Sequence, residues 1–257
     1  IAREFLNAYE TLNDESLLTK CEETIEYCLT GWDSSINSDT GAEWGGIYWG
    51  PDYLSKHACS NGPIISTLVR LSKINPDKVV NGRTYLQWAK DVYDFGLKTF
   101  KMSNDLYGGV TTSHGSLDTT AYTYNTGTMI SGGAYLYEAT KDEKYLNQAK
   151  KSMKASFEYF GDDEVLNGYY QFPLGTTIWF QGYYDLLLVD DSASEYLALI
   201  QKSIDFAYNN YLYDNYLPVN WVSGWQYGLT SDENKDVMDV CASAETYALL
   251  SMKDSLN

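Results

Sequence analysis

The sequence predicts an all-α fold, an α/α barrel in which helical hairpins form a toroid. Apolar residues recur at spacings of three and four along most of the 257-residue chain, which is typical of amphipathic helices. Two kinds of predicted helix alternate: one opens on small residues and glycine, and the other carries a lysine-rich polar face. Tyr-Leu pairs mark the second kind at Tyr85, Tyr145 and Tyr196, spaced by 60 and then 51 residues. That drift favours a closed toroid over an open solenoid, which usually keeps a fixed repeat.

Each predicted hairpin places an inner helix before an outer one. Apolar periodicity and breaks at glycine, proline and aspartate set the boundaries. The predicted helices cover residues 1–13, 15–29, 56–73, 83–100, 124–140, 143–160, 177–189, 192–211 and 236–252. Short turns join the two helices of a hairpin. Long aromatic loops, the last of which holds Trp221 and Trp225, join one hairpin to the next.

The first predicted helix bears on where the domain begins. Helical periodicity runs from Ile1 onward, but no Ser, Thr, Asp or Pro start signal precedes it. A six-hairpin barrel has twelve helices, and the pattern predicts nine. We therefore expect residues 1–257 to be a single α/α-barrel domain whose N-terminal hairpin precedes Ile1.

Composition narrows the possible partners. The formal net charge is −17 and the sequence pI is about 4.3, so we expect neither nucleic acid nor an anionic membrane surface as a partner. The chain holds 24 tyrosines and 7 tryptophans, side chains that join an apolar face to a polar edge. This excess suggests a surface for a polar, ring-shaped partner. No apolar run reaches the length of a membrane span, and no signal peptide is recognisable.

Cysteine and histidine give no sign of a metal or cofactor. The four cysteines and two histidines match none of the zinc-binding spacings. Cys21 and Cys28 lie on one predicted helix, about 10 Å apart along its axis, which is too far for a disulfide. We expect all four cysteines to be small buried hydrophobic residues and His57 to be a packed, hydrogen-bonded residue.

Candidate binding residues lie where the inner helices begin, because these starts should gather at one end of the barrel. The loop from Glu43 to Trp49 holds three aromatic residues that no turn requires. A sugar ring can stack on an indole while its hydroxyls need polar partners nearby. We predict that six residues line a glycan cleft: Trp49, Asn61, Tyr124, Asn125, Phe180 and Gln181. Two alternatives stay open: the loop tryptophans plug the barrel end, or the asparagines only cap their helices.

The adjacent carboxylates Asp162-Asp163 and Asp190-Asp191 are candidates for a catalytic pair. We predict that both pairs lie at tight turns between helices, at the end opposite the aromatic loops. Aspartate is common there because its side chain caps helices and stabilises turns. We therefore reject both as catalytic pairs.

A series of short motifs runs in order along essentially the whole chain. The motifs are Ala8-Tyr9-Glu10, Gly31-Trp32-Asp33, Gly45-Gly46-Ile47-Tyr48-Trp49, Lys56-His57-Ala58-Cys59-Ser60-Asn61-Gly62, Thr123-Tyr124-Asn125-Thr126-Gly127 and Phe180-Gln181-Gly182. Together they resemble glycoside hydrolase family 76, the endo-α-1,6-mannanase family, with Tyr-Asn-x-Gly as the most specific member. The resemblance implies an (α/α)6 barrel that cleaves α-1,6-linked mannan backbones, endo-acting and with retention of configuration.

The resemblance also bears on the catalytic residues. Retaining glycosidases need two carboxyl groups about 5–5.5 Å apart, one as nucleophile and one as general acid/base. In the family, adjacent aspartates at the start of the inner helix that ends in Ala-Tyr-Glu have these roles. Here that helix is 1–13, so the matching position precedes Ile1, and Asp14 lies at the wrong end. No catalytic residue is assigned within the chain.

Three functions fit these observations. The favoured one is an endo-α-1,6-mannanase that degrades mannan, works outside the cytoplasm as a monomer, and needs neither metal nor cofactor. The alternative is a non-catalytic α-mannan-binding relative that lacks the paired aspartates. The third, a sugar epimerase or polysaccharide lyase, is less favoured, because an epimerase cavity usually holds histidines and the chain has only His57 and His114.

Overall fold

The computed structural model describes residues 1–112, 114–166, 168–172, 176–212, 217 and 237–254. Helices dominate these residues, and each helix begins and ends within two residues of its predicted boundary. The predicted loop with Trp221 and Trp225 lies outside the described residues. None of the described helices combines the length and the hydropathy that crossing a membrane requires.

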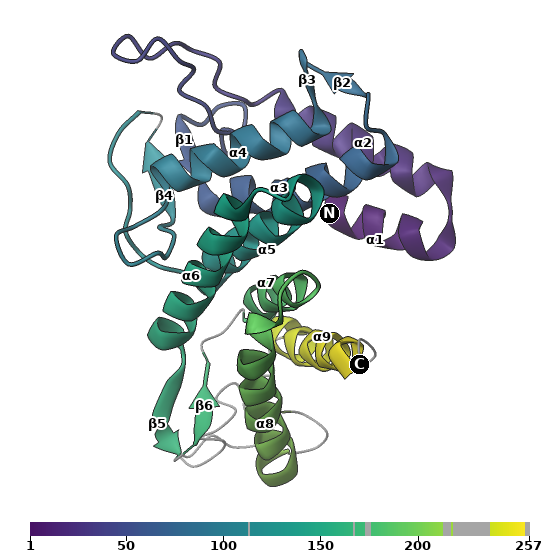
Figure 1. Ribbon diagram of the computed structural model, residues 1–257, viewed down its shortest axis with the longest axis vertical. Coiled ribbons are helices and arrows are strands. Elements are labelled where there is room, and N and C mark those ends of the chain that lie inside the picture. The colour runs from purple at the N-terminus through teal and green to yellow at the C-terminus, as the bar shows by residue number, and fades with distance from the viewer. Residues whose placement is uncertain (113, 167, 173–175, 213–216, 218–236, 255–257) are drawn as a thin grey trace.

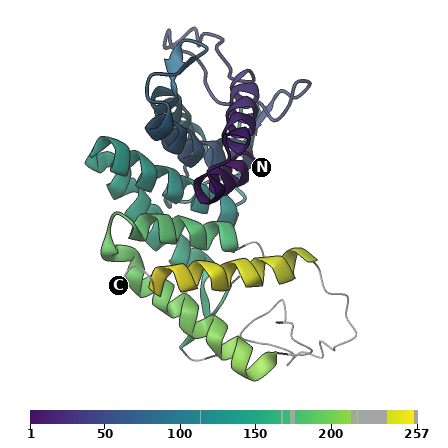
Figure 2. The same cartoon turned by 90° about the vertical axis from the view of Figure 1, so that its right-hand side faces the viewer.

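The odd-numbered helices contact one another in chain order and form an inner row. They are α1 (Ala2–Leu12), α3 (Ala58–Ile74), α5 (Thr123–Thr140), α7 (Thr177–Leu187) and α9 (Val237–Asp254). The even-numbered helices cover this row, and each contacts the inner helix before it. They are α2 (Glu15–Leu29), α4 (Tyr85–Thr99), α6 (Glu143–Phe160) and α8 (Ser194–Tyr211). The helices follow a curved path, with α1 (purple) and α9 (yellow) in front in Figure 2 (Figures 1 and 2). This two-layered alternation is the predicted α/α-barrel arrangement.

Glycine allows the inner helices to approach closely, which explains the small-residue motifs near their starts. A Cβ atom on Gly62 of α3 would collide with Thr128 of α5. A Cβ atom on Gly127 of α5 would collide with the backbone of Trp179 in α7, and one on Gly182 of α7 with the Gly127 carbonyl group. α5 and α7 therefore pack backbone against backbone, and the backbone of α3 packs against the Thr128 side chain of α5.

The tight turns lie at the opposite ends of the inner helices and are built around aspartate. Asp14 and Asp142 are N-caps of α2 and α6, and their side chains accept hydrogen bonds from Ser16 N and Lys144 N. Asp190 caps the 3-10 turn Asp191–Ala193, which leads into α8. These contacts confirm the predicted turn role of Asp190-Asp191.

The prediction for Asp162-Asp163 was wrong. These residues begin strand β5 (Asp162–Leu166), which pairs with β6 (Tyr169–Gln171) on the long connection from α6 to α7. Strand pairing with residues further along the chain overrides the local turn tendency of aspartate. A second short antiparallel pair, β2 (Val79–Val80) with β3 (Arg83–Thr84), lies between α3 and α4.

The four cysteines are free thiols, as expected from their spacing. Cys21 is buried, and Cys28 and Cys59 are partly buried. Cys241 is exposed, contrary to the expectation that all four are buried. It lies in α9, whose weakly patterned sequence does not indicate which face is buried.

Candidate functional site

Two of the long connections meet at the starts of α3 and α5. Strand β1 (Ser55–His57) leads into α3 and pairs antiparallel with β4 (Val110–Thr112) from the connection between α4 and α5. Ala58 N also donates a hydrogen bond to the Gly109 carbonyl oxygen at 2.9 Å. This pairing holds the starts of the two inner helices side by side.

Four aromatic side chains, which we call the aromatic rim, surround this junction: Trp49, His57, Tyr122 and Tyr124. Trp49 stacks on His57 with 4.4 Å between ring centroids, and Tyr122 stacks on Tyr124 at 5.2 Å. Trp49 is 47% exposed and Tyr122 42% exposed, so the rim is partly open to solvent. Burial raises the pKa of Tyr124, so its hydroxyl group stays protonated and can donate as well as accept a hydrogen bond.

The geometry of the rim bears on two predictions, the role of the loop tryptophans and the role of His57. The large exposed area of Trp49 argues against the alternative that the loop tryptophans plug the barrel end. His57 is the N-cap residue of α3, and its Nε2 lies 3.0 Å from Ser55 Oγ. His57 is therefore a packed, hydrogen-bonded residue, as predicted.

Asn61 and Asn125 are buried and tie the aromatic connections to the inner helices. Asn61 accepts a hydrogen bond from Ile47 N at 2.7 Å and donates to the Ile47 carbonyl oxygen at 2.9 Å. Asn125 donates to the Gly108 carbonyl oxygen at 3.2 Å. Each asparagine is only 1% exposed. The N-caps are His57 and Tyr122, without a side-chain cap bond, so neither asparagine caps its helix.

We expect Asn61→Ala to lower the free energy of unfolding by about 2 kcal/mol, because it removes the side-chain partners of both polar backbone groups of Ile47. Asn125→Ala removes one longer bond and should cost about 1 kcal/mol. Urea unfolding of the two variants checks this order. Equal costs would contradict the anchoring role of Asn61.

Phe180 and Gln181 do not lie on the aromatic rim. Phe180 is fully buried and packs its ring against Phe172 and Trp179. Gln181 donates to Asp185 Oδ1 at 2.8 Å and lines a cavity of about 510 Å³ between the inner helices. Arg70 of α3 lines the same cavity, held by two hydrogen bonds to the Glu10 carboxylate. The structure thus brings together Trp49 and Tyr124, supported by the two asparagines, but not Phe180 and Gln181.

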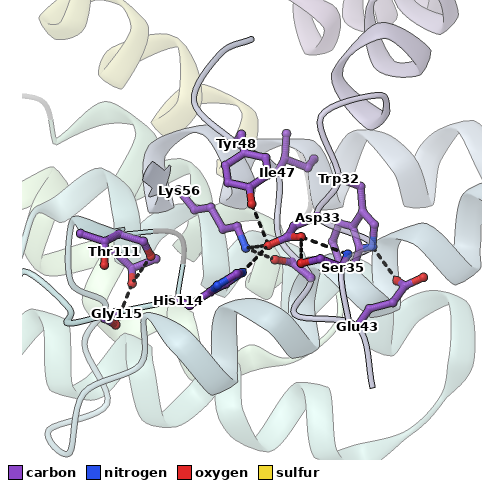
Figure 3. A network of polar contacts seen from close by, with 12 residues as sticks. Trp32, Asp33, Ser35, Glu43, Ile47, Tyr48, Lys56, Thr111, His114 and Gly115 are labelled. Carbon is purple, nitrogen blue, oxygen red and sulfur yellow. Dashed lines mark hydrogen bonds and ion pairs between the residues drawn. The ribbon is translucent and has the colours of Figure 1, made fainter. Parts of the chain in front are cut away.

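A buried ion pair beneath the rim was not singled out from the sequence. Lys56 Nζ lies 2.6 Å from Asp33 Oδ2 and donates to the Gly45 carbonyl oxygen at 2.6 Å (Figure 3). The side chains of Lys56 and Asp33 are 1% and 4% exposed. Asp33 Oδ2 also accepts from the Tyr48 hydroxyl group at 2.9 Å and lies 3.1 Å from His114 Nε2 (Figure 3). The only signal in the sequence was that Lys56 and Asp33 belong to family motifs.

This network keeps Asp33 ionised. Burial opposes ionisation, but hydrogen bonds from Lys56, Ser35 and Tyr48 outweigh it and hold the pKa of Asp33 below its usual range. Burial, together with the contact to Asp33, raises the pKa of Tyr48 to about 12. An ionised Asp33 can only accept, so the His114 Nε2 atom must donate to it. The network thereby joins the α2–α3 connection to the α4–α5 connection, from which His114 comes.

Comparison with known proteins places the chain within a family. The model of glycosyl hydrolase family 76 matches residues 2–224. The chain belongs to glycosyl hydrolase family 76. This family 76 protein is 28% identical over 177 residues to the mannan endo-1,6-α-mannosidase DCW1 of Saccharomyces cerevisiae. The match covers 66% of this chain. The match spans only 38% of the yeast protein's own length.

Solved structures of family 76 share the fold. A mannosidase from Bacteroides thetaiotaomicron superimposes with a TM-score of 0.83 at 20% identity, covering 99% of this chain and 70% of that one. An inactive variant of the α-1,6-mannanase GH76A of Salegentibacter sp. HEL1_6, solved with α-1,6-mannotriose, gives 0.77 at 23% identity, covering 100% and 74%. Two consecutive aspartates are replaced by asparagine in that variant. These likenesses confirm the α/α-barrel fold.

Proposed function

We propose that this chain belongs to an endo-acting, retaining α-1,6-mannanase and contributes the surface that binds the mannan backbone. The aromatic rim at the starts of α3 and α5, in a chain of family 76, is the observation that carries this proposal. The matched part of the yeast mannan endo-1,6-α-mannosidase supports the substrate class.

The rim suits a neutral sugar chain. The exposed part of Trp49 offers an apolar surface for a sugar ring, and the protonated Tyr124 hydroxyl group offers both a donor and an acceptor for sugar hydroxyl groups. Asn61 and Asn125 act from below by fixing the connections that carry the rim. In this proposal Phe180 supports the core and Gln181 serves the interior cavity, so neither contacts the glycan at the rim.

The catalytic carboxylates are proposed from the family pattern. Of the two adjacent aspartate pairs in the sequence, Asp190-Asp191 belongs to a turn, where Asp190 also pairs with Lys150 at 2.9 Å, and Asp162 begins strand β5. We infer from the resemblance that the family's pair directly precedes Ile1. The inactive variant of the Salegentibacter mannanase, in which two consecutive aspartates are replaced, supports the need for such a pair in that enzyme.

Incubation with debranched yeast mannan tests the proposal. The protein carrying the residues that precede Ile1 should release mannooligosaccharides, and the 257-residue chain should retain mannan without cutting it. Retention without products by the longer protein would favour the non-catalytic relative. The absence of retention by both would contradict mannan as the ligand.

We expect Trp49→Ala to weaken mannan binding at least about fivefold, because truncating an aromatic anchor usually costs more than about 1 kcal/mol. Affinity electrophoresis in gels containing mannan measures the change. Tyr27→Ala is the matched control, since Tyr27 is a 68% exposed aromatic residue on the outer helix α2. An equal effect of the two substitutions would argue against the rim.

We also propose that the chain folds as one domain, acts as a monomer and works outside the cytoplasm, at a cell surface, in a periplasm or after secretion. The proposed polysaccharide substrate supports this location, because a large molecule with many polar groups does not cross a bilayer unaided. Neither a metal nor a cofactor enters the proposed reaction, since two carboxyl groups suffice for retaining hydrolysis.

A further inference from the structure

A hollow that is separate from the aromatic rim and from the cavity between the inner helices lies between the α2–α3 connection and α4. Its volume is about 490 Å³, within the usual range of small-molecule sites. Trp32, Glu43, Trp44, Arg83, Asp91 and Asp94 are among the residues that line it. None of the residues of the aromatic rim contributes to it.

Trp44 is held in place before any ligand arrives. Its indole ring stacks on His114 with 4.2 Å between centroids and 18° between planes. His114 is in turn bonded to the buried Asp33 (Figure 3). The backbone is fixed as well, since Trp44 N donates to Ser35 O and Gly45 N to Asp33 O, both at 2.9 Å. A ligand that stacks on a fixed ring loses less entropy on binding than one that must order a mobile side chain.

Polar side chains beside Trp44 are joined to one another by hydrogen bonds and ion pairs, in a row that runs from Trp32 through Glu43 and Arg83 to Asp91. Arg83 donates to Glu43 Oε2 at 2.6 Å and pairs with Asp91 Oδ2 at 2.8 Å. Glu43 Oε2 also accepts from Trp32 Nε1 at 2.7 Å. Each of these bonds uses one oxygen of its carboxylate, and the other oxygen can accept further hydrogen bonds. The Cζ atom of Arg83 also lies over the Trp88 ring, 4.4 Å from its centroid, and this contact helps to hold the guanidinium group in place.

The charges of the lining select against an anionic ligand. Three carboxylates, Glu43, Asp91 and Asp94, face the hollow against the two cations Arg83 and Lys98. An aromatic ring beside acceptors that are already oriented suits a neutral ring compound with several hydroxyl groups. We propose that this hollow is a second saccharide-binding site, centred on Trp44, that holds one part of a glycan chain while the aromatic rim holds another.

This inference rests on the proposed function, because it takes the same class of ligand. Two linked contacts on one polymer raise its retention more than either contact alone, whereas a short oligosaccharide gains nothing from the second site. The two sites should therefore differ in their response to ligand length.

The test compares Trp44→Ala, Trp49→Ala and the Tyr27→Ala control, with debranched yeast mannan and α-1,6-mannotriose as probes. Trp44→Ala should raise the Kd for mannan at least threefold and leave rim binding of mannotriose, measured by calorimetry, within twofold. Trp49→Ala should weaken both. Asp94→Ala is the second variant; Asp94 is exposed on α4, so its loss should spare the fold and raise the Kd for mannan about twofold.

The outcomes separate the two proposals. Mannan affinity that is unchanged in both Trp44→Ala and Asp94→Ala, while Trp49→Ala weakens it, overturns the second site and leaves the proposed function standing. No binding of mannan by the unmodified chain overturns the proposed function, and the second site as a mannan site with it. Weaker binding in Trp44→Ala and Asp94→Ala, with unchanged urea unfolding, supports the second site.

Discussion

Lys56→Met should lower the free energy of unfolding by about 3–5 kcal/mol, the usual cost of removing one partner from a buried ion pair. Methionine approximates the aliphatic part of the lysine side chain but cannot neutralise the carboxylate of Asp33, which is 4% exposed. Asp33 would keep its bonds to Ser35, Tyr48 and His114, yet it would lose the 2.6 Å contact that most favours its charge. Urea unfolding of the variant and of the unmodified chain measures the difference.

The double variant Asp33→Asn/Lys56→Met provides the control. It removes both charges together, so it should recover much of the stability lost in Lys56→Met, and a double-mutant cycle gives the coupling energy of the pair. If the losses of unfolding free energy in Asp33→Asn and Lys56→Met simply add up to the loss in the double variant, the ion pair does not stabilise the α2–α3 connection. Lys73→Met is the comparison for a surface pair: Lys73 is 44% exposed beside Glu138, and its loss should cost less than about 1 kcal/mol.

The fold was predictable because it depends on local sequence. The helix Glu143–Phe160 matches its prediction at both ends, since apolar periodicity and the aspartate cap Asp142 both act within a few residues. The short strands β1 and β4 were not predicted. Each has three residues, and they exist only because Ser55 meets Thr112 across two helices of intervening chain.

The site was only partly predictable, for two physical reasons. Inner helices are covered on several sides, so their sequences lack the polar face that would show which way Phe180 points. In addition, the role of a polar residue depends on distant partners. Asn61 has the local pattern of a cap, but it bonds to Ile47, and Lys56 is buried because it pairs with Asp33, 23 positions away. The exposed Trp49 was found because aromatic residues in a glycine-rich loop have no local explanation.

Gly127→Ala should lower the free energy of unfolding by about 3 kcal/mol, at the upper end of the range for overpacked cores. A Cβ atom at this position would lie 2.6 Å from the Ile178 carbonyl oxygen and against the backbone of Trp179. Backbone atoms cannot rotate away, so α5 and α7 would have to separate. Alanine is better than glycine within a helix by about 1 kcal/mol, and this gain is too small to offset the collision.

Gly96→Ala is the matched control for Gly127→Ala. Gly96 is also buried within a helix, but its added Cβ would meet only the sulfur and terminal methyl group of Met129, at 3.0 and 2.8 Å. Methionine is flexible and can repack, so the helix-propensity gain should keep Gly96→Ala within about 1 kcal/mol of the unmodified chain. Because Gly127 lies three residues after Tyr124, its replacement should also weaken mannan binding, whereas Gly96→Ala should not. Equal stability of the two variants would mean that the inner helices have room to separate, and that the glycine motifs exist for a reason other than close packing.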